Sequence, residues 1–118
     1  MTDAAFRRTI LAAYGGAVMV LLLAPIRAPR VAARVPEADK IVHAALFGLM
    51  AYLIWWNLTA RRWTRALWAV ALSGLLASAV EVLQSIIPYR SADPVDAAAG
   101  LAGAVLCAAL LLRTPPSG

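Results

Sequence analysis

Long apolar stretches separated by short polar gaps dominate the chain. Four stretches of about 18 to 22 residues are evident, at residues 9–26, 41–58, 66–87 and 95–112. At 1.5 Å per residue each would reach about 27 to 33 Å as a helix, enough to cross the hydrocarbon core of a bilayer. Backbone amides in lipid must hydrogen-bond within their own segment, which requires helices. The pattern therefore predicts an all-α integral membrane bundle of four transmembrane helices, forming a single domain over residues 1–118.

Prolines and arginines interrupt the apolar pattern where four helices need connections. They are Pro25, Pro29 and Pro36 in the first gap, Arg61 and Arg62 in the second, Pro88 and Pro94 in the third, and Pro115 and Pro116 after the last stretch. A cleaved signal peptide is an alternative for the first stretch, because Arg7 and Arg8 precede it and small residues follow it at 31–33. Its apolar run exceeds a usual signal core of about 7 to 15 residues, which favours a retained anchor.

Composition agrees with a membrane protein. The chain is 63% apolar and 14% charged, whereas a soluble domain is about half apolar and about a quarter charged. The net charge of +5 does not indicate nucleic-acid binding, because the arginines sit in short gaps between apolar runs, where cations set orientation and meet anionic head groups. The single cysteine, Cys107, lies inside an apolar run and cannot form an intramolecular disulfide.

The distribution of cations between the two ends of the bundle predicts its orientation. Arg27, Arg30, Arg34, Lys40 and Arg90 fall on one side, and Arg7, Arg8, Arg61, Arg62, Arg65 and Arg113 on the other. Acidic neighbours of Lys40 and Arg90 suggest that these two cations belong to a site rather than to the orientation signal. Discounting them leaves six cations against three, which predicts that both termini are cytoplasmic.

Ionisable residues near or inside the stretches are the informative ones, because each costs about 2.5 to 3.5 kcal/mol at the bilayer midplane. Such residues, with one nearby glutamine, begin the second stretch, end the third and begin the fourth. An antiparallel bundle brings these three ends to one membrane face, so we expect their side chains to converge there. They are Asp39, Lys40, His43, Glu81, Gln84, Arg90, Asp93 and Asp96.

Spacings of three and four residues place these side chains on inward helix faces. The second stretch has Asp39, His43, Phe47 and Met50 on one face, the third has Ser73, Ala77, Glu81, Gln84 and Pro88, and the fourth has Asp96, Gly100, Gly103 and Cys107. Small residues after Asp96 would let a neighbouring helix approach closely. Leu75, Leu76, Leu83 and Ile86 form the opposite, lipid-facing side of the third stretch. The spacing thus predicts a shallow polar pocket, open to water on one side.

Three blocks of residues, in this order, resemble the VanZ-like family of small membrane proteins. They are Asp39-Lys40-x-x-His43 with Phe47, Glu81-x-x-Gln84, and Arg90-Ser91-Ala92-Asp93-x-x-Asp96 leading to Gly103. The resemblance implies a bacterial envelope protein, since the family's founding member is associated with low-level resistance to the glycopeptide teicoplanin. The family usually has Asn where Gly100 stands, so this chain lacks one polar group of the cluster.

Each candidate residue also has a simpler structural interpretation. His43 could make only an interhelical hydrogen bond, and Glu81 could pair with Arg90 or Lys40. One histidine with distant carboxylates is a weak metal signal, so no metal site is predicted, and a divalent cation on His43, Glu81 and Asp96 is a minor alternative. Asp93 before Pro94 fits a helix N-cap. Aromatic belts at the membrane interface explain the tryptophans, which are Trp55, Trp56, Trp63 and Trp68.

The sequence leaves three functional hypotheses open and identifies no cofactor. The favoured one is a VanZ-like protein whose outward-facing pocket binds, or conceivably modifies, an anionic envelope lipid or a glycopeptide-type ligand. In it His43, Glu81 and Asp96 form the reactive centre, with His43 or Glu81 carrying a proton. Asp39, Lys40, Gln84, Arg90 and Asp93 bind the ligand, with Arg90 facing the negative charge. The alternatives are a proton-coupled small exporter that uses Glu81, and a structural membrane subunit.

Overall fold

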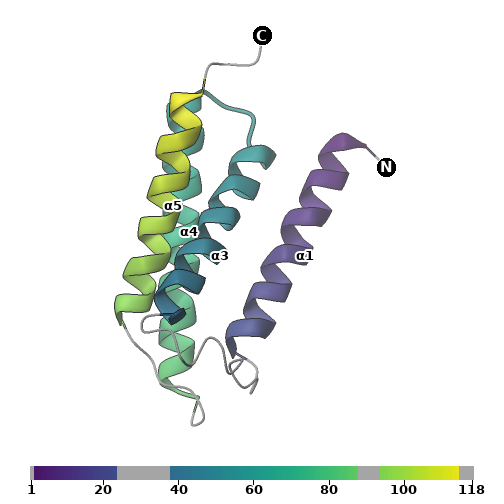
Figure 1. The fold of residues 1–118 in the computed structure, drawn as a ribbon. Helices are drawn as coiled ribbons and strands as arrows, with labels where there is room; N and C mark the ends of the chain where they lie inside the picture. The colour runs from purple at the N-terminus through teal and green to yellow at the C-terminus, as the bar shows by residue number, and fades with distance from the viewer. Residues whose placement is uncertain (1, 24–37, 88–93, 115–118) are drawn as a thin grey trace.

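The computed structural model describes residues 2–23, 38–87 and 94–114. These residues form four α-helices: α1 (Asp3–Leu23), α3 (Ala38–Asn57), α4 (Arg62–Ser85) and α5 (Pro94–Arg113). Neighbouring helices in the chain run antiparallel, so the end of α4 and the beginnings of α3 and α5 lie at the same end of the bundle (Figure 1). The all-α, four-helix prediction is confirmed.

Each helix begins before the apolar run that predicted it, although α3 ends at residue 57 rather than 58 and α4 at residue 85 rather than 87. For example, α1 begins at Asp3 rather than residue 9, and the Thr2 hydroxyl accepts a hydrogen bond from the Ala5 amide at 3.0 Å. Thr2 therefore caps the first turn. At the other end of the chain α5 begins at Pro94, the residue type preferred at a first helical position. Hydropathy marks only the part of a helix that lies in lipid, whereas backbone hydrogen bonding continues into the polar interface.

Three of the described helices, α1, α4 and α5, are long and apolar enough to cross a membrane. The fourth, α3, is similar in length, at 20 residues, but carries Lys40, His43 and Asn57 as well as two tryptophans. Its polar side chains lie near its ends or face the bundle, which suits a helix packed among the other three. Large apolar residues of all four helices are exposed on the outside, among them Val20, Ile41, Leu75, Val82 and Leu106. This is the arrangement expected where the surroundings are lipid.

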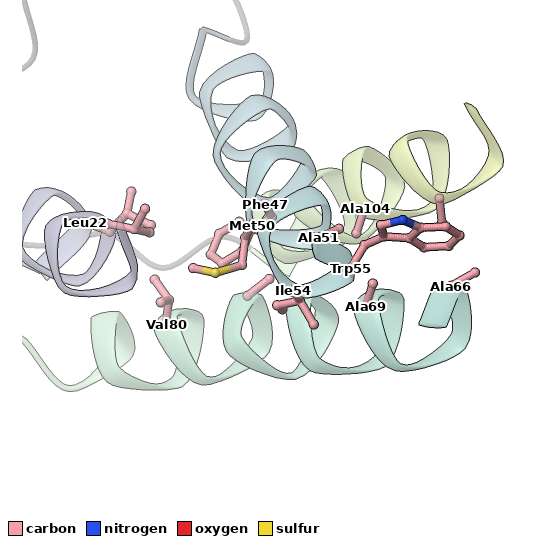
Figure 2. Close-up of a cluster of buried hydrophobic side chains, with 13 residues drawn as sticks. Leu22, Phe47, Met50, Ala51, Ile54, Trp55, Ala66, Ala69, Val80 and Ala104 are labelled. Carbon is pink, nitrogen blue, oxygen red and sulfur yellow. The ribbon is translucent and has the colours of Figure 1, made fainter. Parts of the chain in front are cut away.

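The core is built largely from small side chains. Helix α3 packs most extensively against α5, while α1 contacts α3 and, less closely, α4. Figure 2 shows Trp55 of α3 lying among Ala66, Ala69 and Ala104. Small residues let the helix backbones approach closely, as is common in membrane bundles. The closest approach is at Gly103 of α5, where an added Cβ would lie 2.0 Å from the Ala44 carbonyl oxygen of α3.

The four tryptophans do not share one role. Trp63 and Trp68 are 75% and 55% exposed, consistent with the predicted interfacial belt. Trp55 is only 9% exposed and belongs to the core, so the belt interpretation is wrong for this residue. Trp56 packs edge-on against Phe6 and lies beneath the Arg7 guanidinium. The pattern of apolar and polar residues could not separate these roles, because adjacent residues of a helix point in different directions.

Arginine side chains cap helix ends at the end of the bundle opposite the predicted polar pocket. The Arg65 guanidinium donates to the Trp55 carbonyl through Nε at 3.2 Å and Nη2 at 2.8 Å, and it lies 4.4 Å from the centre of the Trp55 ring. Arg7 donates to the Trp56 carbonyl at 3.0 Å, and Arg62 to the carbonyls of Leu111 and Thr114. The last carbonyls of a helix have no partner within that helix. These cations therefore cap α3 and the end of α5.

We expect Arg65→Met to lower the free energy of unfolding by about 1.5 to 3 kcal/mol, the usual value of hydrogen bonds to a charged group. Methionine keeps an apolar stem but leaves the Trp55 carbonyl without this donor. Unfolding by SDS from mixed micelles, followed by far-UV circular dichroism, would measure the change. The exposed Arg61 is the control: equal losses for Arg61→Met and Arg65→Met would contradict a capping role.

Candidate functional site

Three ionisable side chains meet inside the bundle, each from a different helix. They are His43 of α3, Glu81 of α4 and Asp96 of α5, and one ligand-type atom of each lies within 4.8 Å of the others. His43 Nδ1 is 3.9 Å from Glu81 Oε1, and His43 Nε2 is 3.9 Å from Asp96 Oδ2. We call these three residues the buried triad. Its imidazole ring thus lies between two carboxylates.

The triad is buried rather than open. His43, Glu81 and Asp96 are 4%, 8% and 7% exposed among the described residues. The sequence predicted a shallow pocket open to water, but in the described part of the chain the three side chains are enclosed by helices. Glu81 lies four residues before the end of α4, which corresponds to a depth of about 6 Å. The triad therefore sits close to one end of the bundle yet away from solvent.

Helical periodicity explains why these side chains point inward. On α4, Ser73, Ala77, Glu81 and Gln84 are all buried, as their shared face predicts. On α3, Phe47 and Met50 continue the buried face that begins at His43. Asp96, Gly100, Ala104 and Ala108 form the buried face of α5, so the predicted face is correct at its first two positions, whereas Gly103 and Cys107 are only half-buried. The three inward faces therefore meet around the triad.

An apolar floor lies beneath the triad. The Phe47 ring, 1% exposed, lies 6.1 Å from the His43 ring between centroids. It also occupies the space beside Gly100, where an added Cβ would be 2.8 Å from Phe47 Cδ2. Glycine at position 100 thus makes room for the Phe47 ring. Water has little room to approach the triad from this side.

The remaining predicted site residues are placed differently. Gln84 Nε2 donates to the Leu22 carbonyl of α1 at 2.7 Å, so its amide joins α4 to the end of α1. Lys40 is half-buried and lies one turn before His43 on α3. Arg90 and Asp93 lie outside the described residues, as does the side chain of Asp39. Nothing in the sequence pattern indicated that Gln84 would bind the backbone of α1.

A groove of about 460 Å³ lies elsewhere, between α3 and α5. Its walls are almost entirely apolar and include Ala44, Gly48, Gly103 and Leu106. Gly48 and Gly103 let the backbones of α3 and α5 approach closely along this seam. The triad is not part of its lining.

The described residues therefore define a helical membrane bundle with a buried, ionisable centre at one end. The family model of VanZ/LLP1 matches residues 6–114, nearly the whole chain. The protein belongs to the VanZ/LLP1 family and is a multi-pass membrane protein. No curated protein and no solved structure matches the chain at a significant level.

Proposed function

We propose that the protein is a cell-membrane protein of the bacterial envelope that binds an anionic envelope component at the buried triad and thereby affects sensitivity to teicoplanin. The observation that carries this proposal is the meeting of three ionisable side chains, from three helices, within 4.8 Å. An ionisable residue inside a membrane costs about 2.5 to 3.5 kcal/mol. Three such residues in contact are difficult to explain by packing alone.

The chemistry of the triad supports proton handling beside a ligand. Each nitrogen of the His43 ring faces one carboxylate oxygen, from Glu81 on one side and Asp96 on the other. An imidazole can accept a proton at one nitrogen and release one from the other, so His43 is suited to moving a proton between the carboxylates. Lys40, one turn away, and Arg90, shortly after the end of α4, would supply positive charge for the ligand. A lipid-linked pyrophosphate fits this combination.

The proposed orientation places the triad near the outer leaflet. Most arginines that have no acidic neighbours lie at the opposite end, which the positive-inside rule assigns to the cytoplasm. Both chain termini are then cytoplasmic. An outward-facing site is where an envelope lipid or a glycopeptide would be encountered.

Teicoplanin susceptibility of a bacterial host that expresses the protein tests the proposal. We expect His43→Ala and Glu81→Gln to return the minimum inhibitory concentration to that of the host without the protein, because each removes a member of the triad. Asp3→Asn is the control, because Asp3 is exposed and begins α1, at the end of the bundle opposite the triad. Unchanged resistance in triad variants that accumulate normally in the membrane would overturn the proposal. Proton-driven efflux of a lipophilic cation from proteoliposomes, abolished by Glu81→Gln, would instead indicate an exporter.

A further inference from the structure

We infer that the buried triad binds a divalent transition-metal ion, Zn²⁺ or Mn²⁺. One ring nitrogen of His43 and one oxygen each from Glu81 and Asp96 already lie within 4.8 Å of one another. Donors around a tetrahedral ion with bonds of about 2.0 to 2.1 Å lie about 3.4 Å apart. Small side-chain rotations would close the difference. The inference of an ion does not depend on the proposed function.

The position of the His43 ring gives independent support. His43 Nδ1 is buried and makes no hydrogen bond within the described part of the chain. Its distance of 3.9 Å from Glu81 Oε1 exceeds the range of about 2.7 to 3.2 Å for a hydrogen bond. Buried polar atoms are normally satisfied, and an exception points to a water or an ion bound at the site. The imidazole is thus held at a separation that suits a bridging ion.

Charge within the triad also favours a divalent cation. With a neutral imidazole, two ionised carboxylates give the three side chains a charge of about −2 at neutral pH. Carboxylates held this close together repel each other in an enclosed site, and a divalent ion bound to one oxygen of each reduces that repulsion.

The donor set selects among metals. Imidazole nitrogen suits zinc and iron, while carboxylate oxygen suits magnesium, calcium and manganese. One nitrogen with two carboxylates therefore favours Zn²⁺ or Mn²⁺ over Mg²⁺ and Ca²⁺, which prefer oxygen ligands alone. The ring nitrogen that does not bind the ion can donate a hydrogen bond, which orients the ring. Three protein ligands also leave at least one coordination position open.

The open position links the ion to a ligand, and this step rests on the proposed function. A phosphate oxygen of an anionic lipid can complete the coordination sphere, because carboxylate-bound divalent ions commonly bind substrate phosphates. The ion would then add positive charge to that which the proposed function assigns to Lys40 and Arg90.

Metal titration of the full-length protein in detergent, after treatment with EDTA, tests the inference. We expect one Mn²⁺ to bind per chain, seen as loss of the free Mn²⁺ signal in electron paramagnetic resonance, with Zn²⁺ competing for the site. His43→Ala and Asp96→Asn should each weaken binding by about 10-fold or more. Asp3→Asn should bind as the unaltered protein does. Equal binding in all variants would overturn the inference, as would absence of Mn²⁺ or Zn²⁺ binding.

A second readout uses only the unaltered protein, so it does not depend on whether a variant folds. Electron spin echo modulation of Mn²⁺ bound to the unaltered protein should contain the nitrogen coupling of a histidine ligand. Bound Mn²⁺ without this coupling would contradict the assignment.

Metal binding and resistance can also fail separately. Resistance that depends on the triad without metal binding would leave the proposed function standing, whereas metal binding without an effect on resistance would leave only the ion site.

Discussion

Gly103→Ala is expected to cause the largest loss of stability of any single methyl addition in the bundle. The new Cβ would lie 2.0 Å from the Ala44 oxygen and 2.7 Å from its carbonyl carbon, whereas ordinary contacts begin at 3.4 Å. Both atoms belong to backbone, so no side-chain rotation can relieve the clash. Helices α3 and α5 must separate along their shared interface, which is the most extensive helix–helix interface among the described residues. Overpacking of this kind costs about 1 to 3 kcal/mol, and occasionally more.

The matched control is Gly16→Ala on α1, because nothing lies within 4 Å of the added Cβ there. Alanine is also the better helix former, so this variant should be neutral or slightly stabilised. SDS unfolding of both variants from mixed micelles would measure the difference. Similar stabilities for Gly103→Ala and Gly16→Ala would show that α3 and α5 do not approach as closely as the structure places them.

Gly103→Ala should also change the geometry of the buried triad. His43 is the neighbour of Ala44 on α3, and Asp96 lies two turns before Gly103 on α5. Separation of the two backbones therefore moves the imidazole away from the Asp96 carboxylate. Any Gly103→Ala protein that still folds should bind Mn²⁺ more weakly than Gly16→Ala protein.

Gly100→Ala is the second substitution with a large expected effect. Its Cβ would lie 2.8 Å from Phe47 Cδ2 and 3.1 Å from the Ala77 Cβ, at a position where all three residues are buried. The Phe47 ring is only 1% exposed, so it cannot turn into the surroundings to relieve the contact. We expect the free energy of unfolding to fall by about 1 to 3 kcal/mol, and asparagine at this position should cost more.

A smaller side chain at position 47 should relieve this clash. Phe47→Leu alone leaves a void and lowers stability, but Phe47→Leu combined with Gly100→Ala should be more stable than the sum of the two losses predicts. A double-mutant cycle of SDS unfolding would measure this coupling. Additive losses would mean that Phe47 and residue 100 do not compete for the same space. The cycle therefore tests whether glycine at position 100 makes room for Phe47.

Helical periodicity predicted which faces turn inward, and topology predicted where they meet. The spacing of Ser73, Ala77, Glu81 and Gln84 identifies one face from the sequence, and all four are buried. The short connections make successive helices antiparallel, so His43, Glu81 and Asp96 had to lie at one end. Neither step requires knowledge of how far apart the helices are.

The sequence alone therefore determined the helices, their membrane character, their inward faces and the end at which the polar residues gather. Only the tertiary structure decided that Gly103 touches the Ala44 backbone, that Trp55 enters the core, and that Gln84 binds the Leu22 carbonyl. It also decided that the triad is enclosed. The physical reason is that periodicity fixes the direction of a side chain around its own helix. Distances between helices depend instead on packing, which small residues permit but do not specify.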